Sequence, residues 1–171
     1  MEKQKINIVW FKRDFRLWDH APLQSAIDTD LPTLLLSFFE PSLIDTPQYA
    51  NRHWRFQWEC IEDLNQQLEQ FQAGIYPIYE EVLPTFSLLA ERFDIVHLFS
   101  HQETGLKITF DRDKAVKQFC IKQGIIWQEF RQDGVVRGLG RRPRWQKAWE
   151  KDMRQALIPF AGEKLKAVQL E

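Results

Sequence analysis

A chain of 171 residues is long enough for a core of its own, since chains of this size remove roughly 70% of their extended surface from water on folding. Its composition, with 44% hydrophobic and 27% charged residues and few glycines or prolines, excludes collagen-like, low-complexity and wholly disordered chains. A net charge of -1 also argues against a surface that attracts polyanions everywhere.

Targeting and cysteine patterns favour a cytoplasmic protein without a membrane span. The longest apolar run is shorter than the about 20 residues that cross a bilayer, and the start MEKQKINIVW lacks the apolar core of a signal peptide. Cys60 and Cys120 form no CxxC pair, so we expect two reduced structural thiols.

Five short apolar runs, rich in β-branched and aromatic residues, predict buried strands. They span residues 6–11, 34–39, 75–79, 95–100 and 125–130. Helical patterns lie between them, near residues 22–27, 51–72, 86–93 and 115–120. We expect Gly74 to cap the second of these helices and Gly124 to stop the last. The alternation predicts a Rossmann-like α/β domain over residues 1–130, a five-stranded parallel sheet with helices on both faces.

The rest of the chain has a different character. Residues 131–143, rich in glycine and arginine, predict an interdomain linker, and residues 144–171 predict a helix and tail. Trp145, Trp149, Met153 and Leu157 recur every four residues, as on one face of a helix. That face either packs on the sheet domain or belongs to an interface with further polypeptide. The surplus of basic residues between Arg131 and Arg154 favours a solvated surface over a nucleic-acid site.

Ligands of open parallel sheets bind beyond the carboxyl ends of the strands, where polar residues are therefore candidates. No glycine-rich phosphate loop follows the first strand, and the GxSxG elbow of a nucleophilic serine is absent, so we assign no catalytic residue. His97 and His101 are about 13 Å apart along an extended strand, too far to share a metal ion, and we assign no metal site.

The charged loop after the first strand has two interpretations. Arg13, Asp14, Arg16 and Asp19 could bind an anion through the arginines, or form an ion-pair lattice that clamps the loop to its neighbours. We favour the structural lattice. Tryptophans on the predicted helical faces, including Trp54 and Trp58, are assigned to packing before any ligand.

The segment Ile8 to His20, IVWFKRDFRLWDH, resembles the opening of DNA photolyases and cryptochromes, which reads broadly V-W-F-R-x-D-L-R-x-x-D-N. Lys12 stands where the family usually has arginine, and His20 where it has asparagine. Further segments resemble the family in the same order, namely RHWRF at residues 52–56, HQETG at 101–105, DRD at 111–113 and GVVR at 134–137. The likeness covers essentially the whole chain but only the N-terminal third of a typical member.

The resemblance implies a parent protein that repairs DNA with light, or senses blue light. In that family a C-terminal domain, outside this chain, holds FAD and the damaged DNA. The N-terminal domain supports it and often holds an antenna chromophore, a folate or a deazaflavin. Arg52, His53, His101 and Glu103 are then the antenna candidates, and Arg13, Asp14, Arg16, Asp19, Trp145 and Trp149 structural or interface residues.

Folate-binding members carry an Asn-Glu pair before the RD segment, and residues 105–110 (GLKITF) contain none, which counts against a folate antenna.

Three alternatives for the function of the chain remain open. The chain could be a domain of a photolyase or cryptochrome, inactive alone, or a stand-alone module that binds a chromophore or partner. A nucleotide-binding hydrolase or transferase of similar topology is the third, against which the missing phosphate glycines count.

Overall fold

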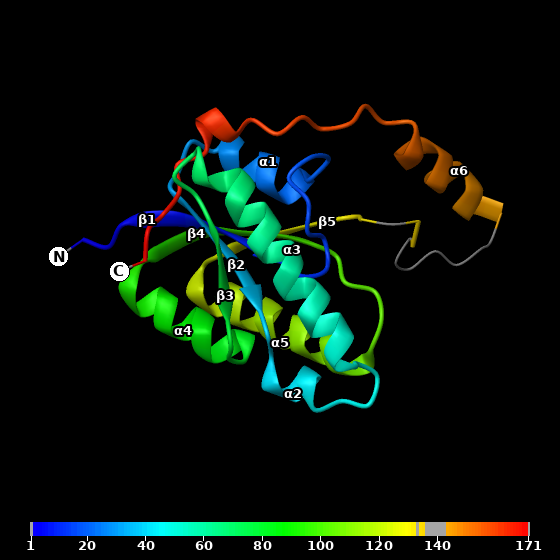
Figure 1. The fold of residues 1–171 in the computed structure, drawn as a ribbon, viewed down its shortest axis with the longest axis horizontal. Coiled ribbons are helices and arrows are strands. Elements are labelled where there is room, and N and C mark those ends of the chain that lie inside the picture. The colour runs from blue at the N-terminus through cyan, green and yellow to red at the C-terminus, as the bar shows by residue number, and fades with distance from the viewer. Residues whose placement is uncertain (1, 133, 136–142, 171) are drawn as a thin grey trace.

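The computed structural model describes residues 2–132, 134–135 and 143–170, without the side chains of residues 143 and 144. Strands and helices alternate along it (Figure 1). In chain order the elements are β1 (Lys5–Phe11), α1 (Ala21–Asp28), β2 (Thr33–Phe38), α2 (Pro41–Ile44), α3 (Asn51–Glu69), β3 (Ile75–Ile78), α4 (Val82–Arg92), β4 (Asp94–His101), α5 (Lys107–Gln123), β5 (Ile126–Phe130), α6 (Pro143–Met153) and a 3₁₀ turn (Gly162–Lys164). No described helix is long and apolar enough to cross a membrane.

The strands form one sheet in the order β3-β2-β1-β4-β5, and every pairing is parallel. This confirms the predicted five-stranded α/β fold. Residues 6–11 of the central strand β1 are all buried, because alternate side chains enter two cores that are both covered.

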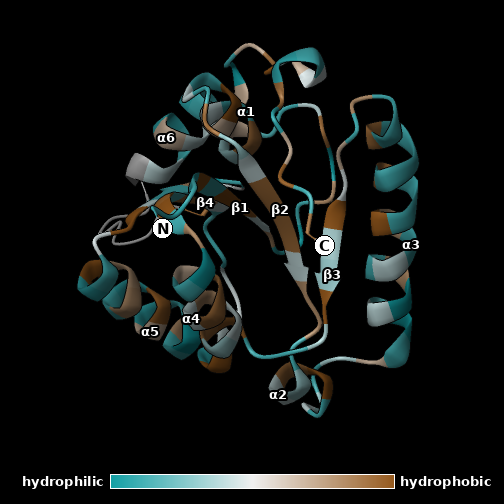
Figure 2. Ribbon diagram, turned by 90° about the vertical axis from the view of Figure 1, so that its left-hand side faces the viewer, coloured by the Kyte–Doolittle hydropathy of each residue, from teal (hydrophilic) through white to brown (hydrophobic). Residues whose placement is uncertain are grey.

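Each face of the sheet has its own apolar layer. Ile8 and Trp10 pack on one face with side chains from α4 and α5, such as Phe86. Val9 and Phe11 pack on the other face, under α1 and α3. Figure 2 shows α4 and α5 on one side of the sheet and α3 on the other. Helices therefore cover both faces, as the alternating pattern predicts.

Helix α3 differs from its prediction at its beginning and its end. Its buried face is Gln57, Ile61, Leu64 and Leu68, whereas Trp58 is 46% exposed. The first turns of the helix lie beside the loop after β2, where the Trp54 ring is 6.1 Å from the Phe39 ring. The two tryptophans of the predicted apolar face, Trp54 and Trp58, therefore contact this loop and are not part of the buried core.

The predicted cap of this helix is also wrong. The helix ends at Glu69, and Gln72, with φ 52°, takes the left-handed conformation instead of Gly74. Gly74 leads into β3, where the Asn65 side chain bonds both backbone groups of Ile75, at 2.7 and 3.0 Å. Gly124, in contrast, does end α5 in the left-handed conformation, with φ 73°.

Helix α6 stands away from the two layers (Figure 1). Trp145 and Trp149 on it are 43% and 39% exposed and stack on each other with ring centroids 6.0 Å apart. Trp145 Nε1 donates to the carbonyl of Gly134 at 2.5 Å. A Cβ atom at Gly134 would come within 2.8 Å of the Trp149 side chain, so a larger residue there would have to displace that ring.

Residues 158–170, which we call the return segment, lead the chain from α6 back to the sheet. The N–H of Asp19 donates to the carbonyl of Ile158, at 2.7 Å. Further along, Thr33 at the start of β2 donates its N–H to Lys166 and accepts one from Val168, at 2.7 and 2.9 Å. Leu165 and Val168 are buried, one on each face of the sheet. The sheet domain therefore does not end at residue 130, because part of the predicted tail completes its core.

Candidate functional site

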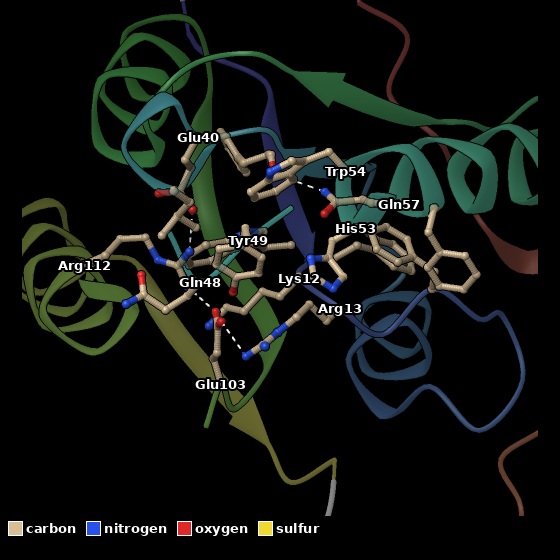
Figure 3. Close-up of a pocket in the computed structure, with 16 residues that line it drawn as sticks. Lys12, Arg13, Glu40, Gln48, Tyr49, His53, Trp54, Gln57, Glu103 and Arg112 are labelled. Atoms are coloured by element: carbon tan, nitrogen blue, oxygen red, sulfur yellow. Dashed lines mark hydrogen bonds and ion pairs between the residues drawn. The ribbon is translucent and has the colours of Figure 1, made fainter. Parts of the chain in front are cut away.

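A cavity of about 420 Å³ opens at the carboxyl edge of the sheet, within the size range of small-molecule sites. The ends of β1 and β2, the loop before α3, the first turns of α3 and residues of α5 surround it (Figure 3). Its lining residues are Trp10, Phe11, Lys12, Arg13, Phe15, Phe38, Glu40, Leu43, Gln48, Tyr49, His53, Trp54, Phe56, Gln57, Glu103 and Arg112.

Aromatic rings make up much of the cavity wall. Trp10 meets Phe38 edge to face, with ring centroids 5.9 Å apart, and the Tyr49 ring lies 4.9 Å from that of Trp54. The Trp54 Nε1 atom is buried and has no hydrogen-bond partner among the described residues. A planar aromatic ligand could stack on these rings.

Arg112 is the centre of the charges in the wall. Its guanidinium group pairs with Glu103 at 2.5 Å, with Asp113 at 2.9 Å and with Oε1 of Glu40. Arg13 reaches the other oxygen of Glu103 at 2.7 Å. Burial alone would lower the pKa of Arg112, but the three carboxylates outweigh burial, and the pKa of Arg112 lies above its ordinary value.

Lys12 fills the space behind these groups. Its ammonium nitrogen lies 2.9 Å from Asp113 Oδ2, 4.2 Å from the centre of the Trp10 ring and 5.4 Å from that of Trp127. Burial lowers the pKa of Lys12, against the opposing effect of Asp113. The ion pair and the ring contacts therefore compensate only part of the loss of hydration.

Glu40 follows the end of β2 and is 3% exposed. Its pKa is raised to about 7, because burial and the neighbouring acids Glu81 and Glu103 raise it by more than Arg112 lowers it. Its second oxygen, Oε2, makes no hydrogen bond or ion pair with the described part of the chain. Glu40 is therefore a carboxyl group of the cavity that can change its protonation near neutral pH.

The predicted antenna residues are only partly brought together. His53 and Glu103 line the cavity, whereas Arg52 is exposed on α3 and is not part of the lining. His101 is buried beside Asp14, again outside the lining. Sequence reasoning misses Arg112 and Tyr49, because the loop before α3 shows no periodic pattern and a charged residue on a helix is usually solvated.

The charged loop after β1 is held by several different contacts. Arg13 pairs with Glu103, and the Asp14 carboxylate accepts the N–H of Lys12 at 2.7 Å. Arg16 donates to the backbone carbonyl of Asp19 and to no described carboxylate. Asp19, with φ 52°, holds the start of the return segment. These contacts fit the lattice interpretation for Arg13 and Asp14 more than for Arg16.

Asp14, His20 and His101 form a buried cluster with the donor types of a metal site. His101 Nδ1 lies 2.5 Å from Asp14 Oδ2, and His20 Nε2 lies 2.9 Å from the same oxygen, at an angle outside good hydrogen-bond geometry. Burial would raise the pKa of Asp14, but the two histidines hold it far below its usual value. Burial lowers the pKa of His20.

The tautomer of His20 decides between metal binding and hydrogen bonding. His20 is the N-cap of α1, and its Nδ1 accepts the N–H of Leu23 at 3.1 Å. The proton of the neutral ring must therefore sit on Nε2, facing Asp14. A metal bound through Nε2 would leave the ring with no proton on either nitrogen. The cluster is therefore a structural clamp between the loop after β1, helix α1 and strand β4.

Trp145 and Trp149 lie on α6, outside the cavity lining, and their predicted role at an interface stays a prediction. Near them Arg131 pairs with Asp152 at 2.6 Å. Of the predicted basic stretch, residues 137, 141 and 142 lie outside the described residues, as does the side chain of residue 144.

Residues 7–140 match the family model of DNA photolyase. Among curated proteins, the deoxyribodipyrimidine photo-lyase of Vibrio cholerae is 24% identical over 131 residues, which cover 73% of this chain and 27% of that protein. The chain thus spans about a quarter of that relative's length.

Solved structures share the fold. A Synechocystis cryptochrome superposes with a TM-score of 0.78 at 18% identity, over 100% of this chain and 39% of that one. A photolyase of Sulfolobus tokodaii, described with two FAD molecules and a novel light-harvesting cofactor, superposes with a TM-score of 0.75 at 16% identity, over 95% and 38%. In both, the matching part is the N-terminal α/β domain.

Proposed function

Because the chain belongs to the DNA photolyase family, we propose that it serves as the N-terminal domain of a photolyase or cryptochrome and holds an antenna chromophore in its cavity. The observation that carries the proposal is the cavity itself. It combines an aromatic wall with a small number of fixed charged groups, as sites for planar cofactors do.

The residues of the cavity fit such a chromophore. Trp54 and Tyr49 offer ring faces. His53 Nδ1 accepts the N–H of Ala50, so in the neutral ring the Nε2 proton is a donor in the lining. When bound, an antenna absorbs light and passes the excitation on. The chain's own residues would orient it and shield it from water.

The type of chromophore is part of the proposal. The segment 105–110 lacks the Asn-Glu pair of folate-binding members, so we favour a deazaflavin or another flavin-type ring over a folate. The Sulfolobus tokodaii photolyase, with its second FAD, is a relative in fold for which such a ring is described as light-harvesting.

Repair or signalling would require the rest of a longer protein. We propose that FAD and damaged DNA bind to a C-terminal domain of that protein, and that the 171 residues alone do not split thymine dimers under light.

The proposal is tested by titrating the purified chain with riboflavin, a deazaflavin and methenyltetrahydrofolate, following tryptophan fluorescence. We expect one flavin-type ring per chain and weaker binding of the folate. Trp54→Ala should weaken binding about tenfold, since a lost aromatic contact is worth about 1 kcal/mol or somewhat more.

Trp58→Ala is the matched control, because Trp58 lies one helical turn further along α3 but does not line the cavity. It should leave the affinity unchanged. Equal loss in both variants, or no binding of any of the three compounds, would contradict the cavity as the antenna site.

A further inference from the structure

The charges around the cavity are balanced and almost completely paired. Lys12, Arg13 and Arg112 face Glu40, Glu103 and Asp113. Both oxygens of Glu103 and both of Asp113 have a cationic partner. Glu40 is different, because Arg112 occupies only its Oε1.

Glu40 is surrounded by groups of both signs. Arg112 approaches it from α5, Glu103 from the loop after β4 and Glu81 from the start of α4. Glu81 itself is held by Ser42, whose N–H and hydroxyl group donate to it at 2.8 and 2.9 Å. Two acids and one shared guanidinium group therefore act on a carboxyl group that has little access to water.

A ring bound in the cavity would change this balance. Displacing the water that still reaches Glu40 would penalise its charged form further, whereas the neutral acid keeps a hydrogen-bond donor for the ligand. An acceptor on the ligand edge, such as a ring carbonyl, would pair with that donor. A carboxylate, in contrast, would face the carbonyl oxygen with like charge.

We propose that Glu40 determines the ligand specificity of the cavity. It takes up a proton when a planar heteroaromatic ligand binds, and its Oε2–H then donates a hydrogen bond to a carbonyl oxygen at the edge of that ligand. The inference rests on the proposed function, since it needs a ring in the same cavity. It adds the chemical class of that ligand, a heterocycle with an edge carbonyl, and a pH dependence of its binding.

The pH dependence of binding is set by the pKa of Glu40 in the protein without ligand. With a pKa of about 7 before binding, Glu40 loses its proton as the pH rises from 7 to 8.5, and ligand affinity should fall with the protonated fraction. Riboflavin is the probe, because its ring carries edge carbonyls and does not ionise in this interval. Histidines can also titrate in this interval, and His53 lines the cavity, so the part that belongs to Glu40 is taken from the comparison with Glu40→Gln.

The expected result is a rise of the riboflavin Kd by about 15-fold between pH 7 and pH 8.5, as follows from the loss of the protonated form. Glu40→Gln keeps a neutral donor and should bind with the same Kd at both pH values. Glu91→Gln, an exposed acid on α4, is the matched control and should keep the pH dependence of the unchanged chain.

Calorimetry in two buffers of different ionisation enthalpy gives a second measurement that needs no variant. At pH 7.5 the unchanged chain should take up between about half a proton and one proton per riboflavin. Riboflavin binding without proton uptake, or with the same affinity at pH 7 and 8.5, would overturn the role of Glu40 and leave the antenna site intact. Absence of riboflavin binding at every pH would also overturn the role of Glu40, and absence of binding of the deazaflavin and the folate as well would overturn the antenna site.

Discussion

The two edges of the sheet are closed in different ways. At the amino edge the return segment bonds its backbone to Thr33 and places Leu165 and Val168 in the two cores. At the carboxyl edge, charged side chains around Arg112 and the cluster around Asp14 hold the loops together, and a cavity stays open between them.

The difference shows which edge can work as a site. Backbone hydrogen bonds and apolar contacts do not titrate, so they close the amino edge permanently. Buried charges, in contrast, contribute to stability only while each has its partner, and they can respond to a ligand or to pH. Three substitutions test this contrast between the edges.

Arg112→Leu should have the largest effect. It leaves Glu40 without its cation and takes one partner each from Glu103 and Asp113, and removing one partner of a buried pair costs roughly 3–5 kcal/mol. Urea denaturation at pH 7 measures the loss. Arg55→Leu is the control, because Arg55 pairs with Glu59 on the surface of α3 and should cost less than about 1 kcal/mol. Similar losses in the two variants would mean that the carboxyl-edge network contributes no more than a surface pair.

Leu165→Ala should lower the free energy of unfolding by about 2–3 kcal/mol, since it empties part of the core under α1 and α3. Leu157→Ala, at a position 77% exposed just before the return segment, should change it by less than about 0.5 kcal/mol. The same urea titration measures both. If neither variant is destabilised, the return segment does not close the amino edge.

Asp14→Asn should cost about 2 kcal/mol at pH 7, because the amide replaces a charged acceptor of the clamp. The folded-state pKa of Asp14 is depressed, so its contribution is complete above the unfolded pKa near 4 and is lost as the pH falls through the folded value. The difference from the unchanged chain should therefore shrink as unfolding is followed from pH 5 to pH 2.5. Asp45→Asn, an exposed acid, should show no such trend.

The sheet could be predicted because each strand is a continuous apolar run between helical patterns. Residues 6–11 in β1 are an example, since a run buried on both faces needs no knowledge of its partners. Gly124 could be predicted as well, because the need for a left-handed cap is local. The cap predicted at Gly74 is wrong because a distant side chain organises that turn. Asn65 hydrogen-bonds to Ile75, and Gln72 has the positive φ instead of Gly74.

The site was less accessible from sequence. Polar residues at strand ends, such as Glu40, could be found by position, but their partner Arg112 lies 72 residues further along the chain. His101 is an antenna candidate only through the family resemblance, and the structure places it at the end of β4, outside the cavity lining. Its role in the clamp depends on His20, which becomes a neighbour only when α1 folds against β4. The return segment carries two buried apolar side chains, Leu165 and Val168, in a short irregular stretch, which no period could indicate.

The path of the return segment fixes where additions to the chain emerge. Val168 hydrogen-bonds at the start of β2 and Lys5 pairs at the start of β4, so both termini leave from the edge opposite the cavity. A fluorescent protein or an affinity tag fused to either end would therefore be kept away from the cavity mouth by the length of the strands. Energy-transfer measurements between such a donor and a ring in the cavity would have a built-in spacer of one strand length.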